Sequence, residues 1–278
     1  MDAALSWDEE RHARLLAGLR EVGDFQLAHF GGLDPERVTE KGERDLVSWV
    51  DTESETRLAR RLGDLLPDAG LLGEEQGERA GGAASGLTWI VDPLDGTTNY
   101  AYRHPFFGIS VALVRGREPV LGVIHAPRLA ETFHGWAGGG AWLDTPDGRR
   151  EPLRVSPRVE PRHALLATGF ADSRSVRADV NVRNLDRMLH ATRGVRRAGA
   201  ACLDLAFVAA GRLDGFWEMG LHPWDVAAGS FLVRAAGGRV TDLRGREDAL
   251  SGRQILASNG RLHDWLLAGL ELDPRFDG

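Results

Sequence analysis

The sequence predicts a mixed α/β fold built from helices and groups of short strands. Three observations predict it. Apolar residues recur at helical spacing from Leu15 to Leu27 near the start of the chain. Strand-like segments separated by glycine and proline fill residues 87–136, and strand-like and helix-like segments alternate after residue 165. Elements in this order pack as layers of helix and sheet around an apolar core.

The first half of the chain begins with two predicted helices. The first covers residues 7–30 and ends at Gly31 and Gly32. The second covers residues 50–66, with Asp51 and Thr52 as candidate caps and Pro67 as its terminator. Short strands follow, and their close spacing predicts a largely antiparallel sheet: residues 87–91, 108–114, 120–125 and 131–136.

The second half alternates strands and helices after a turn-rich stretch at residues 138–150. The predicted strands are residues 153–156, 165–169, 195–198, 215–219, 239–242 and 254–258. The predicted helices are residues 180–192, 203–211, 224–236 and a terminal helix from residue 262. We expect two subdomains, residues 1–152 and 153–278.

Composition and charge narrow the class of protein. The 34 basic and 41 acidic residues give a net charge of −7, which argues against binding to nucleic acid or to an anionic membrane. An anionic substrate would need local positive charge, such as a metal ion. Cys202 is the only cysteine, so no intrachain disulfide can form, and no apolar run approaches the roughly 18 residues of a membrane span. We expect a soluble, cytoplasmic protein.

Two common catalytic motifs are absent or incomplete. Lys41 is the only lysine and lies outside a P-loop pattern, which excludes that form of nucleotide binding. Ser110 lies in a segment one residue short of the nucleophile elbow G-x-S-x-G, and its apolar neighbours predict an interior strand serine instead. Cys202 lies in an apolar helical run and is expected to serve packing.

Residues 89–100 carry the strongest chemical signal. An apolar strand runs into Asp92, Pro93, Leu94 and Asp95, so two carboxylates emerge where the strand ends and a turn begins. Carboxylate and carbonyl oxygens are the ligands that Mg²⁺ prefers. If Thr97 opens a helix, the free amide groups there would face an anion.

Two other acidic sites resemble this one. Glu74 follows the short apolar segment at residues 71–73, and Asp225 stands at the start of a predicted helix. For Asp225 the alternative is simple helix capping. Four carboxylates in one cleft would repel, and bound cations would remove that conflict.

These segments resemble the inositol monophosphatase family of Mg²⁺-dependent, lithium-sensitive phosphatases. The matching motifs are KGERDLVSWVD at 41–51, GEE at 73–75, DPLDGTTN at 92–99, GAACLDLAFVAAGRLDGFWEMG at 199–220 and WDVAAG at 224–229. The resemblance covers most of the chain. It implies a layered αβαβα sandwich of the inositol monophosphatase and fructose-1,6-bisphosphatase type, with a metal cleft between the two subdomains.

The resemblance also implies roles for individual residues. Glu74, Asp92 and the carbonyl of Leu94 resemble the ligands of a first Mg²⁺ ion. Asp92, Asp95 and Asp225 resemble those of a second, and the family uses two or three ions. Thr97, hydrogen-bonded to Asp51, matches the pair that orients and deprotonates the attacking water, with Glu74 also counted as catalytic. The residues expected near the substrate are Gly96, Thr97, Gly199, Ala200, Ala201, Glu218 and Asp225, with Lys41 on a mobile loop.

The implied activity is hydrolysis of a small phosphate monoester by metal-activated water, inositol monophosphate being the preferred substrate. Relatives that act on fructose 1,6-bisphosphate, histidinol phosphate or 3′-phosphoadenosine 5′-phosphate keep those substrates as alternatives. A covalent aspartyl route is disfavoured because Asp92 and Asp95 are three residues apart and do not form D-x-D. A homodimer is expected. A regulatory binding protein with incidental phosphatase activity is the alternative of another class.

Overall fold

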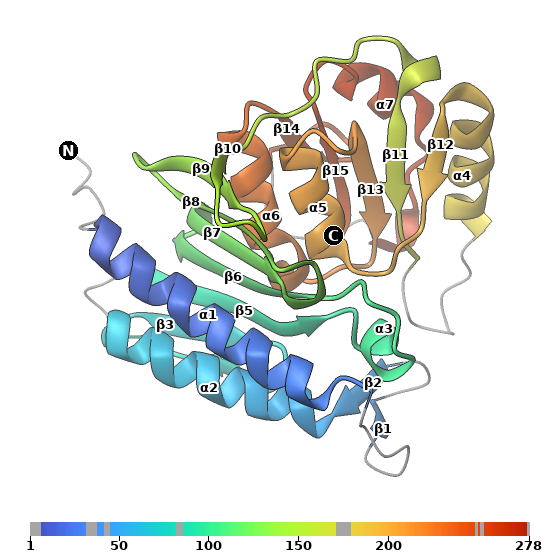
Figure 1. The fold of residues 1–278 in the computed structure, drawn as a ribbon. Coiled ribbons are helices and arrows are strands. Elements are labelled where there is room, and N and C mark those ends of the chain that lie inside the picture. The colour runs from blue at the N-terminus through green and yellow to red at the C-terminus, as the bar shows by residue number, and fades with distance from the viewer. Residues whose placement is uncertain are drawn as a thin grey trace.

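The computed structural model describes residues 7–31, 38–41, 45–81, 86–170, 179–247, 250 and 253–276. Helices cover and separate two large sheets, so that five layers alternate as helix, sheet, helix, sheet and helix (Figure 1). The predicted layered α/β fold is therefore confirmed. In the described part of the chain, no helix is both long enough and apolar enough to cross a membrane.

The larger sheet has eight strands in the order β10-β9-β8-β7-β6-β5-β3-β4. Its strands are β3 (Gly70–Gly73), β4 (Gly77–Arg79), β5 (Leu87–Asp95), β6 (Gly108–Arg115), β7 (Glu118–Ala126), β8 (Glu131–Trp136), β9 (Gly140–Asp144) and β10 (Arg150–Pro152). All neighbours pair antiparallel except β3 and β5, which are parallel. The expected, largely antiparallel sheet is confirmed.

The smaller sheet has five strands in the order β12-β11-β13-β15-β14. They are β11 (Leu165–Thr168), β12 (Gly194–Arg196), β13 (Gly215–Met219), β14 (Arg239–Asp242) and β15 (Gln254–Ser258). A separate two-stranded hairpin joins β1 (Val38–Lys41) to β2 (Asp45–Ser48). The larger sheet ends at Pro152 and the smaller begins at Leu165. The division into subdomains at residue 152 stays a prediction.

The helices occupy three layers. Helices α1 (Glu9–His29) and α2 (Trp49–Leu65) cover the outer face of the larger sheet, and α5 (Ala201–Ala209) and α6 (Pro223–Ala235) lie between the sheets (Figure 1). Helices α4 (Asp179–Ala191) and α7 (His263–Gly269) cover the outer face of the smaller sheet, and the short helix α3 (Thr97–Ala101) follows β5. Because α5 and α6 are enclosed by two sheets, they are apolar on nearly all sides.

Alternation along the central strands explains why the larger sheet is covered on both faces. In β5, Trp89 and Val91 face α1 and α2, whereas Ile90 faces α5 and α6. In the smaller sheet, Phe216 faces the inner helices and Trp217 the outer ones. Successive strand residues point to opposite faces, so each strand contributes to two cores. Phe216 and Trp217 therefore fill the core on opposite faces of the sheet.

The structure corrects the prediction around residue 152. Residues 153–156 form no strand, because Leu153 N–H donates to Ala141 at 2.9 Å while Val155 N–H donates to Ala236 at 3.2 Å. A segment that changes partners in this way cannot continue one ladder. The stretch at residues 138–150, expected to be turns, contains β9 and the start of β10.

A chain of buried aromatic nitrogens attaches α1 to the larger sheet. Trp7 Nε1–H donates to His12 Nδ1 at 3.2 Å, and His12 Nε2 lies 2.8 Å from His134 Nδ1. His134 Nε2 in turn lies 3.3 Å from Asp144 Oδ1. Since His12 Nδ1 accepts the indole hydrogen, the proton of each neutral ring belongs on Nε2. Burial lowers the pKa of His12 to about 3 and that of His134 to about 4.

We expect both rings to stay neutral, as Nε2–H tautomers, from pH 8 down to about pH 5. The unfolded chain takes up these protons near pH 6.5, so the pair lowers the free energy of unfolding as the pH falls below about 6.5. Long-range ¹⁵N–¹H NMR of the ring nitrogens measures both properties. A proton on Nδ1 of either ring, or a titration midpoint near 6.5, would contradict this arrangement.

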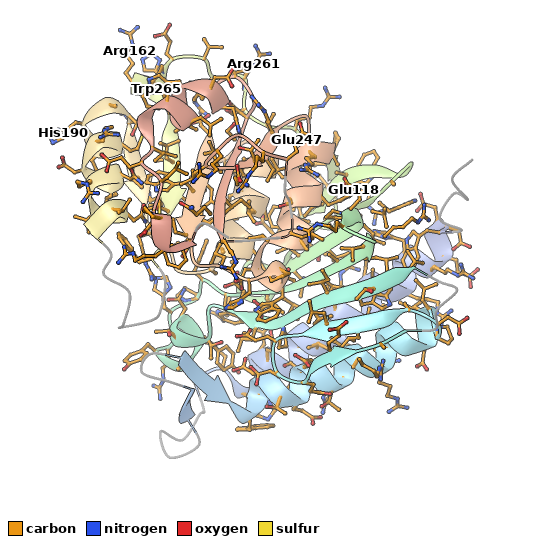
Figure 2. All side chains as sticks on the ribbon, turned by 180° about the vertical axis from the view of Figure 1, so that it is seen from behind. Glu118, Arg162, His190, Glu247, Arg261 and Trp265 are labelled. Atoms are coloured by element: carbon orange, nitrogen blue, oxygen red, sulfur yellow. The ribbon has the colours of Figure 1, made fainter. Side chains whose placement is uncertain are left out.

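Three other histidines lie on the surface or stack on a neighbouring ring. His190 on α4 projects from the surface, as Figure 2 shows from behind, and its side chain is 83% exposed. His104 is also exposed, and His222 stacks on Trp224 with ring centroids 4.7 Å apart. These three histidines are therefore structural or solvent-facing.

Candidate active site

The end of β5 breaks the sheet ladder and brings two carboxylates together. Asp92 pairs with Ser110 and Asp95 with Gly108, so one extra residue lies on the β5 side. Pro93 has no N–H to give to the ladder, which favours a bulge at this point. Asp92 accepts the Leu94 N–H at 2.9 Å within the bulge. Ser110, opposite, is a buried interior strand residue, as expected.

Gly96 turns the chain from β5 into α3. Its φ of +90° is left-handed, a conformation that glycine adopts without strain. Thr97 opens α3, and its hydroxyl donates to the carbonyl of Leu94 at 3.0 Å. The bond from Thr97 to Asp51 stays a prediction.

Asp51 is almost fully buried beside α3. Burial, and then the charge of Asp51, raise the pKa of Tyr100 on that helix. Asp51 lies in the first turn of α2, which begins at Trp49 directly after β2, so the expected cap at residues 51–52 is wrong. The fold thus brings this acid to α3.

Glu74 leaves the sheet at the end of β3, beside β5. Its N–H donates to the carbonyl of Val91 at 3.3 Å. The turn that follows is held by the fully buried Glu55 of α2, whose carboxylate accepts the N–H groups of Glu75 and Gln76, each at 2.8 Å. A side chain at Gly73 would collide with that carboxylate. Glu55 was missed as a site-forming residue, because a glutamate within a helix gives no signal of its own.

Asp225 lies in the first turn of α6, at the third helical position. Its carboxylate accepts the His222 N–H at 2.7 Å, which completes a capping box. Ser110 Oγ donates to the carbonyl of Trp224 at 3.0 Å and so fixes the start of α6 against β6. Capping and a role in the site are therefore compatible for Asp225.

The four acids share one electrostatic environment. Burial raises the pKa of Asp92 well above its ordinary value. Three further carboxylates raise it more, namely Glu74, Asp95 and Asp225, whereas the Leu94 N–H lowers it. The fold therefore gathers the carboxylates of Glu74, Asp95 and Asp225 around the buried carboxyl group of Asp92. A cation among them would remove the repulsion.

These oxygens suit Mg²⁺ by their chemistry. The donors are carboxylates and one backbone carbonyl, which are the hard ligands that this ion takes, and the site offers no thiolate or imidazole ligand. Within the described residues, no three acidic, histidine or cysteine side chains already stand in ligating geometry. Instead, one carboxylate oxygen in each of three acids accepts a hydrogen bond from a backbone N–H: Asp92, Asp95 and Asp225.

The start of α5 contacts the end of β5. Cys202 N–H, in the first turn of α5, donates to Asp95 Oδ2 at 2.6 Å. A Cβ on Gly96 would lie 3.3 Å from both Ala200 Cβ and Gly199 O. The structure therefore brings Gly96 together with Gly199 and Ala200, all expected near the substrate. The Cys202 thiol is fully buried and its pKa is raised by that burial, so packing is confirmed for the side chain.

Glu218 lies on β13 at the inner side of the same region. Its buried carboxylate packs directly over Gly169, where no side chain would fit. Burial raises the pKa of Glu218, the charges of Asp204 and then Asp225 raise it further, and the charge of Arg197 lowers it. Asp204, buried in the first turn of α5, is a neighbour that the sequence did not single out.

One predicted site residue cannot be placed by its side chain. Lys41 ends β1, but its side chain and residues 42–44 lie outside the described part of the chain, as does the side chain of Ser48. Arg197 is exposed, and its charge lowers the pKa of both Glu218 and Asp204, so this side chain lies on the side of the site.

This fold and this set of acids define a phosphoric monoester hydrolase. The chain belongs to the inositol monophosphatase family, whose sequence model matches residues 15–272. An inositol-1-monophosphatase of Caulobacter vibrioides is 40% identical over 258 residues, covering 92% of this chain and 99% of the relative. A putative Nus factor SuhB of Neisseria meningitidis serogroup B is 39% identical, covering 87% of this chain and 91% of that protein. The crystal structure of the extragenic suppressor protein suhB from Bartonella henselae matches with a TM-score of 0.86 at 36% identity, covering 94% of this chain and 98% of the other.

Proposed function

We propose that this enzyme hydrolyses inositol monophosphate, a small phosphate monoester, with Mg²⁺ and a water molecule. The observation that carries the proposal is the buried carboxyl of Asp92, surrounded by the carboxylates of Glu74, Asp95 and Asp225. Such a concentration of negative charge fits cations better than it fits an anionic substrate alone. The names of the Caulobacter relative and of the family support inositol phosphate as the substrate.

The ligand roles proposed here are those that the resemblance to the family implies. Glu74, Asp92 and the carbonyl of Leu94 would hold one Mg²⁺ ion. Asp92, Asp95 and Asp225 would hold a second. When bound, Mg²⁺ supplies polarisation of the phosphoryl group and lowers the pKa of a coordinated water molecule.

The neighbouring groups of the chain would position the water and the ester. Thr97 at the start of α3 and Asp51 behind that helix are the pair that would orient the water and take its proton. The amide group of Ala201, in the first turn of α5, would face the phosphoryl oxygens at the positive end of the helix, while the Cys202 N–H is held by Asp95. Glu218 would accept hydrogen bonds from the hydroxyl groups of the alcohol.

A regulatory role is the second candidate, and the name of the Neisseria relative favours it. The carboxylates proposed as ligands are all present, which supports catalysis in this chain. Purification of the tagged chain from its own cells would distinguish the two functions. A stoichiometric macromolecular partner on a catalytically silent chain would replace the proposal. A homodimer and a cytoplasmic location stay predictions.

A panel of phosphate monoesters tests the proposed function directly. The panel should contain inositol 1-phosphate, fructose 1,6-bisphosphate, histidinol phosphate and 3′-phosphoadenosine 5′-phosphate, ranked by kcat/KM with Mg²⁺ present. We expect the inositol ester to rank first, a chelator to abolish turnover and added Mg²⁺ to restore it. Turnover that persists in the presence of the chelator would overturn the proposed dependence on Mg²⁺. Another ester ranking first would overturn inositol monophosphate as the substrate.

A further inference from the structure

The side chain of Asn99 connects α3 to the loop before β6 and to the turn before α5. Asn99 lies in the middle of α3, within the half of the chain that carries the larger sheet. Its Nδ2 donates to Phe106 O at 2.7 Å in the loop before β6. The same nitrogen donates to Ala198 O at 2.9 Å and, more weakly, to Gly199 O at 3.3 Å, in the turn that opens α5.

A glycine with a left-handed backbone conformation lies on each side of this contact. Gly199 has a φ of +85°, and a Cβ there would lie 3.3 Å from Asn99 Nδ2 and 2.6 Å from Arg197 Nη1. Gly96 has a φ of +90°, and a Cβ there would lie 3.3 Å from Gly199 O. These two glycines therefore allow α3 and the turn before α5 to come close enough for the amide group of Asn99 to reach both segments.

The contact fixes the distance between α3 and α5 at the point where the proposed substrate would lie. The carbonyls of residues 198 and 199 directly precede the first turn of α5, and the Cys202 N–H of that turn donates to Asp95. Moving the turn would thus move the α5 amides away from Asp95. An amide side chain suits this task because it has two N–H donors for the two shortest contacts.

We propose that Asn99 is a positioning residue that holds the α5 amides in register with Asp95, and so sets the affinity for Mg²⁺ and for the phosphoryl group. The inference rests on the proposed function for its consequences in catalysis. The register itself does not depend on that function. Asn99 touches neither the ester nor the ions in this account and acts through the turn at residues 198–200.

The Asn99→Ala variant tests the proposal at two levels. Hydrogen–deuterium exchange of peptides spanning residues 198–203 should become at least about tenfold faster, because the carbonyls that precede α5 lose their hydrogen bonds to Asn99 and the turn opens more often. Titration calorimetry with MgCl₂ alone should show a dissociation constant about three- to tenfold higher, the range that loss of one or two hydrogen bonds produces. KM for inositol 1-phosphate should rise by a similar factor, while kcat at saturating Mg²⁺ and substrate changes less than about threefold.

A matched variant, Asn184→Ala, separates positioning from general loosening. Asn184 also bonds the backbone of a distant segment, since it donates to Glu271 O at 3.0 Å and accepts from Glu271 N–H at 2.8 Å, but it lies on α4. We expect exchange at residues 198–203 and the Mg²⁺ affinity to stay at wild-type values in this variant. Equal changes in both variants would overturn the proposal, because they would show a general loss of stability.

The outcomes also separate this inference from the proposed function. Wild-type exchange, Mg²⁺ affinity and KM in Asn99→Ala would reject the positioning role while leaving phosphatase activity in place. Faster exchange in Asn99→Ala on a chain that hydrolyses no phosphate monoester would keep the register role and reject the function. If Asn99→Ala does not fold, Asn99→Asp keeps the shape of the side chain but replaces the donor group by an acceptor, and the same faster exchange is expected.

Discussion

An Asp95→Asn variant is expected to keep the fold and to lose about two to three orders of magnitude in kcat, the equivalent of about 3–4 kcal/mol in transition-state stabilisation. Asp95 Oδ2 accepts the Cys202 N–H at 2.6 Å, and an amide oxygen can also accept that hydrogen, in a weaker bond. The substitution therefore removes a negative charge from the proposed second Mg²⁺ site while keeping the contact between β5 and α5.

Turnover of inositol 1-phosphate over a range of Mg²⁺ concentrations measures this effect. Asp186→Asn, which removes a charge from a carboxylate that is 76% exposed on α4, serves as the control and should behave as wild type. Thermal melting of the metal-free chains should give similar midpoints for all three proteins. More than a tenth of wild-type kcat at saturating Mg²⁺ would remove Asp95 from the metal site.

Replacing Glu218 by methionine is expected to lower kcat/KM for inositol phosphates by about one to two orders of magnitude, through the loss of one or two charge-assisted hydrogen bonds. Methionine keeps the length of the side chain that packs over Gly169 but has no oxygen to accept from a hydroxyl group. An aryl phosphate has no such hydroxyls, so its hydrolysis should barely change.

The ratio of kcat/KM values on inositol 1-phosphate and on an aryl phosphate is the quantity to compare. It should fall by about the full factor expected for the inositol ester, because the aryl ester reports the metals and the phosphoryl site alone. If kcat/KM falls equally for both substrates, Glu218 acts on the metal ions or on folding and not on the alcohol. Glu218 would then no longer support inositol monophosphate as the substrate.

Local signals in the sequence determined most elements of this fold. Short apolar runs bounded by glycine and proline marked β5 and β6, and these strands are apolar on both sides because both faces of their sheet are covered by helices. Glycine and proline marked the ends of α1 and α2, and Pro93 marked the break in β5. Residues 153–156 looked like a strand because apolar alternation cannot show which partner each N–H finds.

The sequence also named the acids of the candidate site, since Asp92 and Asp95 lie in one short motif and Glu74 and Asp225 end or begin single elements. Their closeness was implied by family resemblance, not by spacing. Only the tertiary structure decided that their charges act on one another, because 133 residues separate Asp92 from Asp225. The same holds for Glu55, which reaches the turn after Glu74 from another helix.

The contacts between distant segments had no signal that a single sequence could give. Asn99 meets a carbonyl 100 residues away, and His12 meets a ring 122 residues away. A hydrogen-bond donor is chosen by the geometry of its acceptor, whereas periodicity and turn residues report only the burial and bending of the local chain. The sequence by itself thus determined the elements and the ligand chemistry, and packing of the two sheets decided which side chains hold the site in register.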